Sequence, residues 1–251
     1  MKEKIYNENI LTDVIFEMKF PPILELMDGE NLHVSKFQKK IVDKFPYLDI
    51  KKDEEITLNV SQISSERKKI TSWLFKDKDN SFKNNNAPTK IVSFNYNQIV
   101  LHYKNSYSNF NDFLETIYLI FDALSEYSVR KTKYISMRYV NQIKLENNEN
   151  WNGLINKNLC FTSDFVKNNV LRSMHSLEFK EEDYVINFNF GEFNSDYPHP
   201  ISKKEFVLDY ICKYKESTDI EDVSKIAKKM NELIHEWFEK SILKGLRDII
   251  G

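Results

Sequence analysis

The chain has 251 residues, enough to bury a core in one large domain or two small ones. Its formal charge of −2 and pI of about 6.3 exclude an obviously basic nucleic-acid binder, so any such binding must use local patches. Two cysteines are too few for a disulfide framework. Because we find neither a signal-peptide pattern nor an apolar stretch long enough to span a membrane, we expect a cytoplasmic protein.

The first half of the chain shows strand-like and helix-like hydrophobic patterns in turn. The segment 11–22 alternates apolar and polar residues and ends at two prolines, which stop a strand. The segment 110–127 has apolar residues at helical spacing, with Asn109 or Asn111 as a suitable N-cap. In chain order we expect a strand in 11–22, a helix in 31–46, strands at 56–63, 70–75, 91–96 and 98–104, and a helix at 110–127.

The second half follows a similar order. The acidic segment KEED is a suitable hairpin turn, and Thr218 with Glu221 fits a capping box at the start of the last helix. In chain order we expect a strand at 134–145, a short helix at 151–160, hairpin strands at 170–179 and 184–190, a strand at 205–214, and a long helix at 218–250.

This repeated order predicts an α+β fold with a mainly antiparallel sheet and the two long helices on one face. Residues 1–128 would form the first β-α-β(n)-α half and residues 129–251 the second, within one continuous structural unit. The layout resembles the saddle of TATA-binding-protein-like folds, and a helix-grip fold is the alternative. A fold analogy of this kind implies no function.

The strand predicted at 134–145 carries two polar residues that need an explanation. Asn141 interrupts its apolar face, and Arg138 lies in the middle of the other face. Asn141 could satisfy a bulge or strand crossing while Arg138 pairs with an acid such as Glu17 or Asp209 on a neighbouring strand. Alternatively, the two residues line a polar groove for a ligand or face a partner chain. We favour the structural role, since buried polar pairs can fix strand register.

Three segments together resemble a sporadically distributed, uncharacterised bacterial family of about this length. They are ILTDVIFEMKFPP, SMRYVNQIKL and LIHEWFEKSILKGLRDIIG. The matching positions are Glu17, Arg138, Tyr139, Asn141, His235, Phe238, Glu239 and Gly251. The chain departs from the family pattern at Ser136, where a glycine is usual, and at Ile211, where the second acid of L-D-x-D is missing. The resemblance implies no catalytic residues, and the family's patchy distribution suggests mobile elements, phage defence or counter-defence.

The sequence contains none of the common nucleotide-binding, hydrolase or zinc motifs, and its five histidines are dispersed. We therefore assign no catalytic residue, metal or cofactor. The enzymatic alternative is a metal-dependent nuclease in which Asp164 and Glu178 hold Mg²⁺ and Lys180 orients water or stabilises the developing charge. A chain with 29% charged residues produces such a pattern easily.

Two basic clusters are candidate phosphate contacts, with Trp73 and Tyr134 nearby for stacking on bases. The first is expected in a hairpin turn and the second just before the strand at 134–145. Their members are Arg67, Lys68 and Lys69, and Arg130, Lys131 and Lys133. Both clusters are also explained as solvated loop charge.

We expect a non-enzymatic binding protein that acts through protein–protein or protein–nucleic-acid contacts, in a setting such as phage defence or counter-defence. A protein or ribonucleoprotein partner is favoured, nucleic acid is an option, and no membrane is involved. Besides the nuclease, the alternative is a small-ligand binder that uses the open face of the sheet. A homodimer is a further option if the end of the last helix extends and pairs with a second copy.

Overall fold

The computed structural model describes residues 6, 10–59, 64–78, 87–145, 151–160, 170–199 and 203–251, and only the backbone of 55–59 and 64–68. The fold is α+β, with a nine-stranded antiparallel sheet and helices, which confirms the predicted fold class. No helix in these described ranges is long and apolar enough to cross a membrane.

In its described residues the first half of the chain forms five strands and the helices α1 and α2. Two short 3-10 turns, Leu24–Leu26 and Ser125–Tyr127, follow β1 and α2. The elements are β1 (Leu11–Lys19), α1 (Asn31–Ile41), β2 (Tyr47–Asn59), β3 (Ser64–Lys76), β4 (Lys90–Asn95), β5 (Gln98–Lys104) and α2 (Phe110–Leu124).

Within the residues that the structure describes, the second half adds four long strands and the helices α4 and α5. Two short strands, β6 (Lys131–Thr132) and β11 (Thr218–Asp219), pair with each other as a separate small sheet. The other elements are β7 (Tyr134–Leu145), β8 (Ser173–Glu181), β9 (Tyr184–Phe193), β10 (Lys204–Tyr214), α4 (Val223–Ser241) and α5 (Lys244–Ile250).

The strand order of the large sheet is β2-β3-β4-β5-β1-β7-β10-β9-β8, and every neighbouring pair is antiparallel. The opening strands of the two halves, β1 and β7, therefore lie side by side at the centre. The last strand before each long helix, β5 or β10, lies next to the opening strand of its own half. The strands β2 and β8 form the two outer edges.

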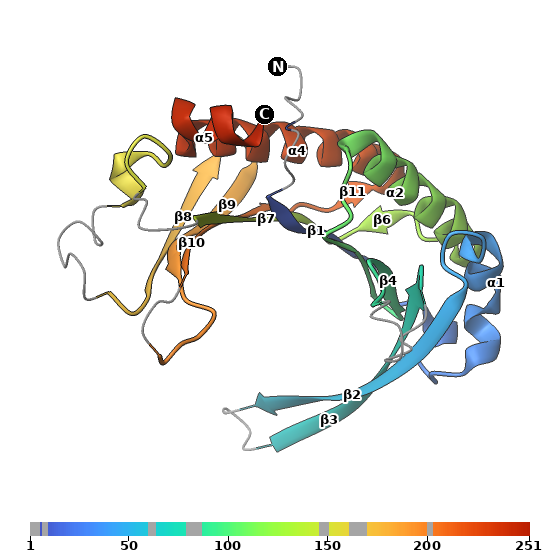
Figure 1. The fold of residues 1–251 in the computed structure, drawn as a ribbon. Helices are drawn as coiled ribbons and strands as arrows, with labels where there is room; N and C mark the ends of the chain where they lie inside the picture. The colour runs from blue at the N-terminus through green and yellow to red at the C-terminus, as the bar shows by residue number, and fades with distance from the viewer. Residues whose placement is uncertain are drawn as a thin grey trace.

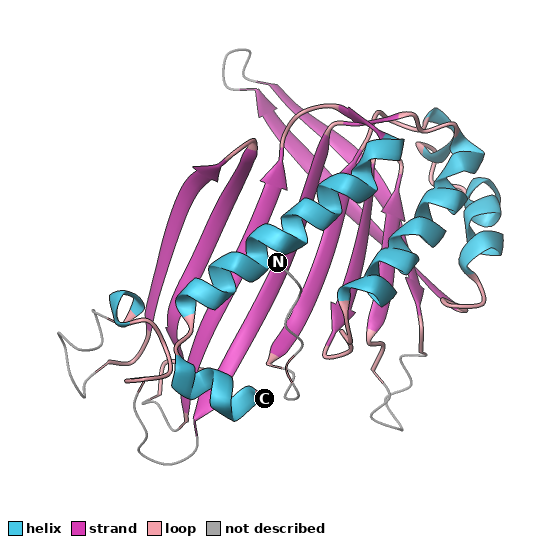
Figure 2. Ribbon diagram, turned by 90° about the horizontal axis from the view of Figure 1, so that it is seen from above, coloured by secondary structure: helices cyan, strands magenta, loops and turns pink. Residues whose placement is uncertain are grey.

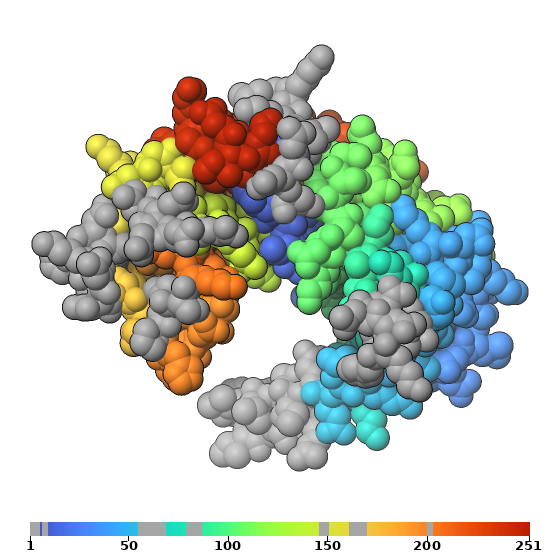
Figure 3. Space-filling model, in the orientation of Figure 1, coloured from blue at the N-terminus to red at the C-terminus, as the bar shows by residue number. Residues whose placement is uncertain are grey.

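The sheet curves into an arch (Figure 1). The helices lie on its convex side, where α2 and α4 cross the strands next to each other (Figure 2). None of the described helices lies on the concave side, and the space-filling view shows this side as a hollow (Figure 3). We call the two sides the helix face and the open face.

The core lies between the sheet and the helices. Strand alternation places Phe16 and Met18 of β1 and Met137 of β7 on the helix face, and all three are fully buried. The helix α2 begins at the predicted cap, because the Asn109 side chain accepts a hydrogen bond from the Asp112 backbone N–H at 3.0 Å. Burial of the apolar stripe of α2 and α4 then holds both helices on the sheet.

Four local predictions are wrong. Residues 151–160 form turns and a 3-10 segment, Lys157–Leu159, rather than a short α-helix. Thr218 belongs to β11, and the N-cap of α4 is Asp222 without a side-chain capping bond. The last helix is interrupted at Ile242, whose extended backbone separates α4 from α5. Residues 67–69 lie within β3 and not in a turn, because β2 and β3 are both longer than expected.

The β8–β9 hairpin has the predicted turn after Glu181 and depends on one glycine. Gly191 has φ +144°, and a Cβ there would lie 1.8 Å from the Ser173 carbonyl oxygen on β8. This position therefore requires glycine, since a side chain would push the outer strand away.

Candidate functional site

One row of directly paired residues crosses the open face at the centre of the sheet, and we call it the Arg138 row. Strand register places Arg138 of β7 between Ile15 of β1 and Ile211 of β10. Beyond the isoleucines lie His102 of β5 on one side and Asn187 of β9 on the other. The row ends at β8, and its members from β5 to β8 are His102, Ile15, Arg138, Ile211, Asn187 and Glu178.

Arg138 reaches diagonally from this row to Asp209 of β10. Its Nε donates to Oδ1 at 2.8 Å and its Nη2 donates to Oδ2 at 3.0 Å. Asn189 of β9 donates to the same Oδ2 at 3.1 Å. Hydrogen bonding to Asp209 raises the pKa of Arg138 and outweighs the opposite effect of burial, so the guanidinium stays charged. The predicted pairing with an acid is confirmed, and Asp209 is that acid.

The other carboxylates near the centre of the open face also have partners. Asp13 Oδ1 lies 2.7 Å from the His102 ring Nε2. Glu17 accepts a hydrogen bond from the Gln98 amide at 2.7 Å, and Gln142 donates to Glu205 at 3.1 Å. Since each acid accepts from or contacts a neighbour on the next strand, the face is a network of compensated polar groups.

Half-buried aliphatic side chains fill the space between these polar groups. Each lies at an alternate strand position that points to the open face. They are Ile15, Val100, Val140, Val185, Val207 and Ile211. The open face is therefore amphiphilic, with apolar patches between paired polar residues.

The charges on this face nearly cancel. Register places Asp13 directly opposite Lys104 and Glu205 directly opposite Lys144. From β5 to β8 the open-face acids are Asp13, Glu17, Glu178, Glu205 and Asp209, and the cations are Lys19, Lys104, Arg138, Lys144, Lys180 and Lys213. A phosphate backbone binds an uncompensated positive surface, and this interleaved pattern does not provide one.

Asn141 lies on the helix face, opposite to Arg138, and only 2% of it is exposed. Its amide donates to the Leu208 carbonyl at 3.2 Å. The β1 strand shifts register between Leu11 and Asp13, next to Asn141. Because this hydrogen bond goes to β10 and not to the bulged strand β1, the predicted role of Asn141 in satisfying a bulge stays a prediction. The two residues do not line one groove together, because they point to opposite faces.

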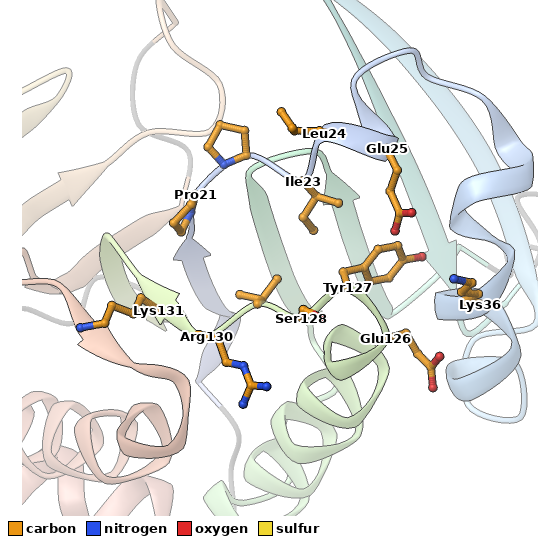
Figure 4. A pocket seen from close by; sticks show the side chains of 12 residues that line it. Pro21, Ile23, Leu24, Glu25, Lys36, Glu126, Tyr127, Ser128, Arg130 and Lys131 are labelled. Atoms are coloured by element: carbon orange, nitrogen blue, oxygen red, sulfur yellow. The ribbon is translucent and has the colours of Figure 1, made fainter.

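The basic clusters lie away from the centre of the open face. Lys69 is exposed on β3, while the side chains of Arg67 and Lys68 lie outside the described set. Arg130 and Lys131 line a shallow open cleft beyond the end of β1, and Lys133 lies two residues further along (Figure 4).

The cleft contains charges of both signs. Arg130 and Lys131 lie on one side of the cleft, while Glu25 and Glu126 lie on the other side, where Lys36 is (Figure 4). The Lys131 Nζ also lies 3.8 Å from Oδ1 of Asp219. The opposed carboxylates weaken the attraction of this cleft for a phosphate.

The proposed nuclease residues are only partly placed. Glu178 and Lys180 lie two residues apart on the open face of β8, and Asp164 lies outside the described residues. Glu178 accepts a hydrogen bond from Asn187 at 2.6 Å. Within the ranges that the structure describes, one group of three side chains has metal-ligand spacing, the exposed Asp28 and Glu30 before α1 and the half-buried His33 within it.

The residues that carry the family resemblance fall into separate places. Glu17 and Arg138 lie on the open face, while the Tyr139 hydroxyl donates to Asn231 of α4 at 2.6 Å inside the core. Near the C-terminus, Glu239 accepts hydrogen bonds from Arg247 and from the Tyr6 hydroxyl. These contacts hold helices on the sheet and α5 on α4, so most of the resemblance maps to structural positions.

The sequence reasoning did not identify several members of this network, namely His102, Asn187, Asn189, Gln98, Gln142 and Glu205. They belong to strands that are distant along the chain, and only the register brings them together. A polar residue at an alternate position of an otherwise apolar strand is the signal that could have identified them.

A comparison with protein-family models finds no match to this chain, and a search of curated proteins finds none either.

Proposed function

We propose that this chain is a binding protein whose open face takes a segment of a partner protein. The observation that carries the proposal is the Arg138 row, where charged and amide side chains alternate with the half-buried Ile15 and Ile211. Protein interfaces combine apolar contacts with satisfied polar groups in this way.

Charge balance favours a polypeptide over a nucleic acid as the partner. Arg138 is already neutralised by Asp209, and the acids Asp13 and Glu17 would repel phosphates at the centre of the hollow. The concave shape suits an elongated or convex partner surface (Figure 3). Phage defence or counter-defence stays a prediction that depends on the family resemblance.

A pull-down from an extract of the native host tests the proposal, with bound proteins and nucleic acids both identified. The variant Ile211→Lys places a charge on the open face, and Leu24→Lys is the control, on an exposed residue of the 3-10 turn that follows β1. We expect a stoichiometric protein partner that survives nuclease treatment and is lost with Ile211→Lys but kept with Leu24→Lys. Equal melting temperatures would show that both variants remain folded.

Three other outcomes would replace the proposal. Retention of nucleic acid with steep salt dependence would favour a nucleic-acid partner. A chain that retains no macromolecule would favour the small-ligand alternative, for which the concave hollow is the observation, and a heat-shift screen of metabolites would follow. Nuclease activity with Mg²⁺ or Mn²⁺ would establish the enzymatic alternative.

A further inference from the structure

The strand β8 ends the sheet, and its outer side is paired with no described strand. Alternate residues of such an edge direct backbone N–H and C=O groups outward, where another strand can pair with them. Proteins usually protect edges with charge or with a covering segment. Here Leu177 at the centre of β8 is 50% exposed, and Met174 is exposed as well.

The charged side chains of β8 are spaced so that they complement those of a second, antiparallel β8 strand. Glu178 and Lys180 flank Phe179, and both are exposed on the open face. An antiparallel pairing of two β8 strands about a two-fold axis places residues opposite each other symmetrically. If the axis passes through Phe179, Glu178 of each copy lies directly opposite Lys180 of the other, which gives two complementary charge pairs.

The neighbouring registers are worse. An axis through Glu178 or through Lys180 would place two like charges directly opposite each other. An axis through Leu177 would place Glu178 opposite Ser176, so the complementary pairs would be lost. Charge therefore selects the register centred on Phe179.

The helix face supports the same register. The Phe179 ring lies 4.5 Å from the ring of Trp237 on α4. A second Phe179 at the axis would extend this pair into a four-ring aromatic cluster across the two copies. In the same register Leu177 lies directly opposite Glu181 of the second copy.

We propose that two copies of this chain associate through antiparallel pairing of their β8 strands, with Phe179 at the two-fold axis, to form one continuous sheet of both copies. The proposal concerns the outer edge of β8 and not binding by the open face, although Glu178 is also the last member of the Arg138 row, so its test measures molecular mass alone. It also differs from a dimer built on an extended last helix, because Leu246 and Ile250 of α5 are buried within their own chain. A single-strand contact is small, so we expect a weak dimer.

Charge reversal tests the pairing, with the molecular mass measured by sedimentation over a concentration series of roughly 1 µM to 1 mM. Lys180→Glu and Glu178→Lys should each weaken dimerisation by roughly tenfold or more, because like charges then face each other. The double variant Glu178→Lys with Lys180→Glu should restore it, and an equimolar mixture of the two single variants should form a heterodimer. Lys228→Glu, on an exposed position of α4, is the control and should dimerise like the wild type.

If the double variant dimerises again, unfolding cannot explain the loss of dimerisation in the single variants. The melting temperatures of all variants provide a second check on folding. A wild-type chain that stays monomeric across the series overturns the proposal. So does a dimer that ignores both single reversals, since its interface would then lie elsewhere, and so does a double variant that fails to restore a dimer lost in the singles.

Discussion

Arg138 and Asp209 form an asymmetric ion pair across β7 and β10. The side chain of Asp209 is 7% exposed, whereas that of Arg138 is 42% exposed. The carboxylate is thus held inside the sheet by Arg138 and Asn189, while part of the guanidinium still faces the concave hollow. One residue can therefore stabilise the fold and contact a partner at the same time.

Removal of this guanidinium should destabilise the protein. Arg138→Ala leaves the buried Asp209 with only Asn189 as a described side-chain donor, so we expect a loss of about 1–3 kcal/mol in the free energy of unfolding. Urea denaturation measures the loss. Lys144→Ala, an exposed change on the same strand and face, is the control. Adding Asp209→Asn to Arg138→Ala should recover part of the loss, and an unchanged stability of the single variant would contradict the structural role.

The outer hairpin should be sensitive to a single methyl group. Gly191→Ala forces a Cβ toward the Ser173 carbonyl at a positive φ, so we expect a loss of more than about 2 kcal/mol. Gly153→Ala is the matched control, since Gly153 also has a positive φ, +81°, but has free space around the position of a Cβ. Thermal melting compares the two. Equal effects would mean that backbone strain, and not the close approach of β8, dominates.

A hydroxyl in the core joins β7 to α4. Tyr139→Phe leaves the Asn231 side chain without the donor that now lies 2.6 Å away, so we expect a loss of about 1–2 kcal/mol. Tyr118→Phe on the half-exposed side of α2 is the control and should change stability by less than about 0.5 kcal/mol. Denaturant midpoints at one pH measure both. A neutral result for Tyr139→Phe would show that water replaces the lost donor.

The first turn of α2 should make stability depend on acid pH. Burial alone would raise the pKa of Asp112, but hydrogen bonding and charge from Lys90 and Lys44 outweigh it and lower the pKa below its ordinary value of 3.8. A carboxyl whose pKa is lowered by folding stabilises the protein above its unfolded pKa. That stabilisation is lost as the pH falls through the lower folded value.

Asp112→Asn should therefore be less stable than the wild type at pH 7, and the difference should shrink as the pH falls below about 3.8. The two melting temperatures are compared from pH 7 to pH 2.5. Other acids titrate in the same range, but they do so in both proteins and cancel in the difference. A gap that stays constant with pH would show that Asp112 acts through hydrogen bonding and not through its charge.

Local patterns in the sequence predicted most of the elements because their hydrophobic periods are strong. The stripe of α2 and its cap at Asn109 are examples, since both depend on residues close together in the chain. The break between α4 and α5 was missed because the apolar spacing continues through it. At that point Ile242 leaves the helical conformation, and the Leu243 backbone N–H donates to the Leu154 carbonyl at 2.8 Å. A tertiary contact overrides the local pattern there.

The candidate site was predictable only in part for the same reason. The alternation of side chains along β7 places Arg138 and Asn141 on opposite faces, and the sequence also predicts an acidic partner for Arg138. Whether Glu17 or Asp209 would be that acid depended on the registers of β1 and β10, and strand periodicity alone does not fix register. The register also decides that Ile15 and Ile211 lie beside Arg138, and this neighbourhood carries the proposed function.

The central position of β1 has a consequence for synthesis of the chain. On the ribosome, β1 through β5 emerge before β7, so β1 can pair with β5 while its other side waits for the second half. During that interval the future centre of the sheet is an open edge with Phe16 and Met18 beside it. A chain that terminates early, or translation that stalls before residue 134, would leave this edge exposed and prone to aggregation.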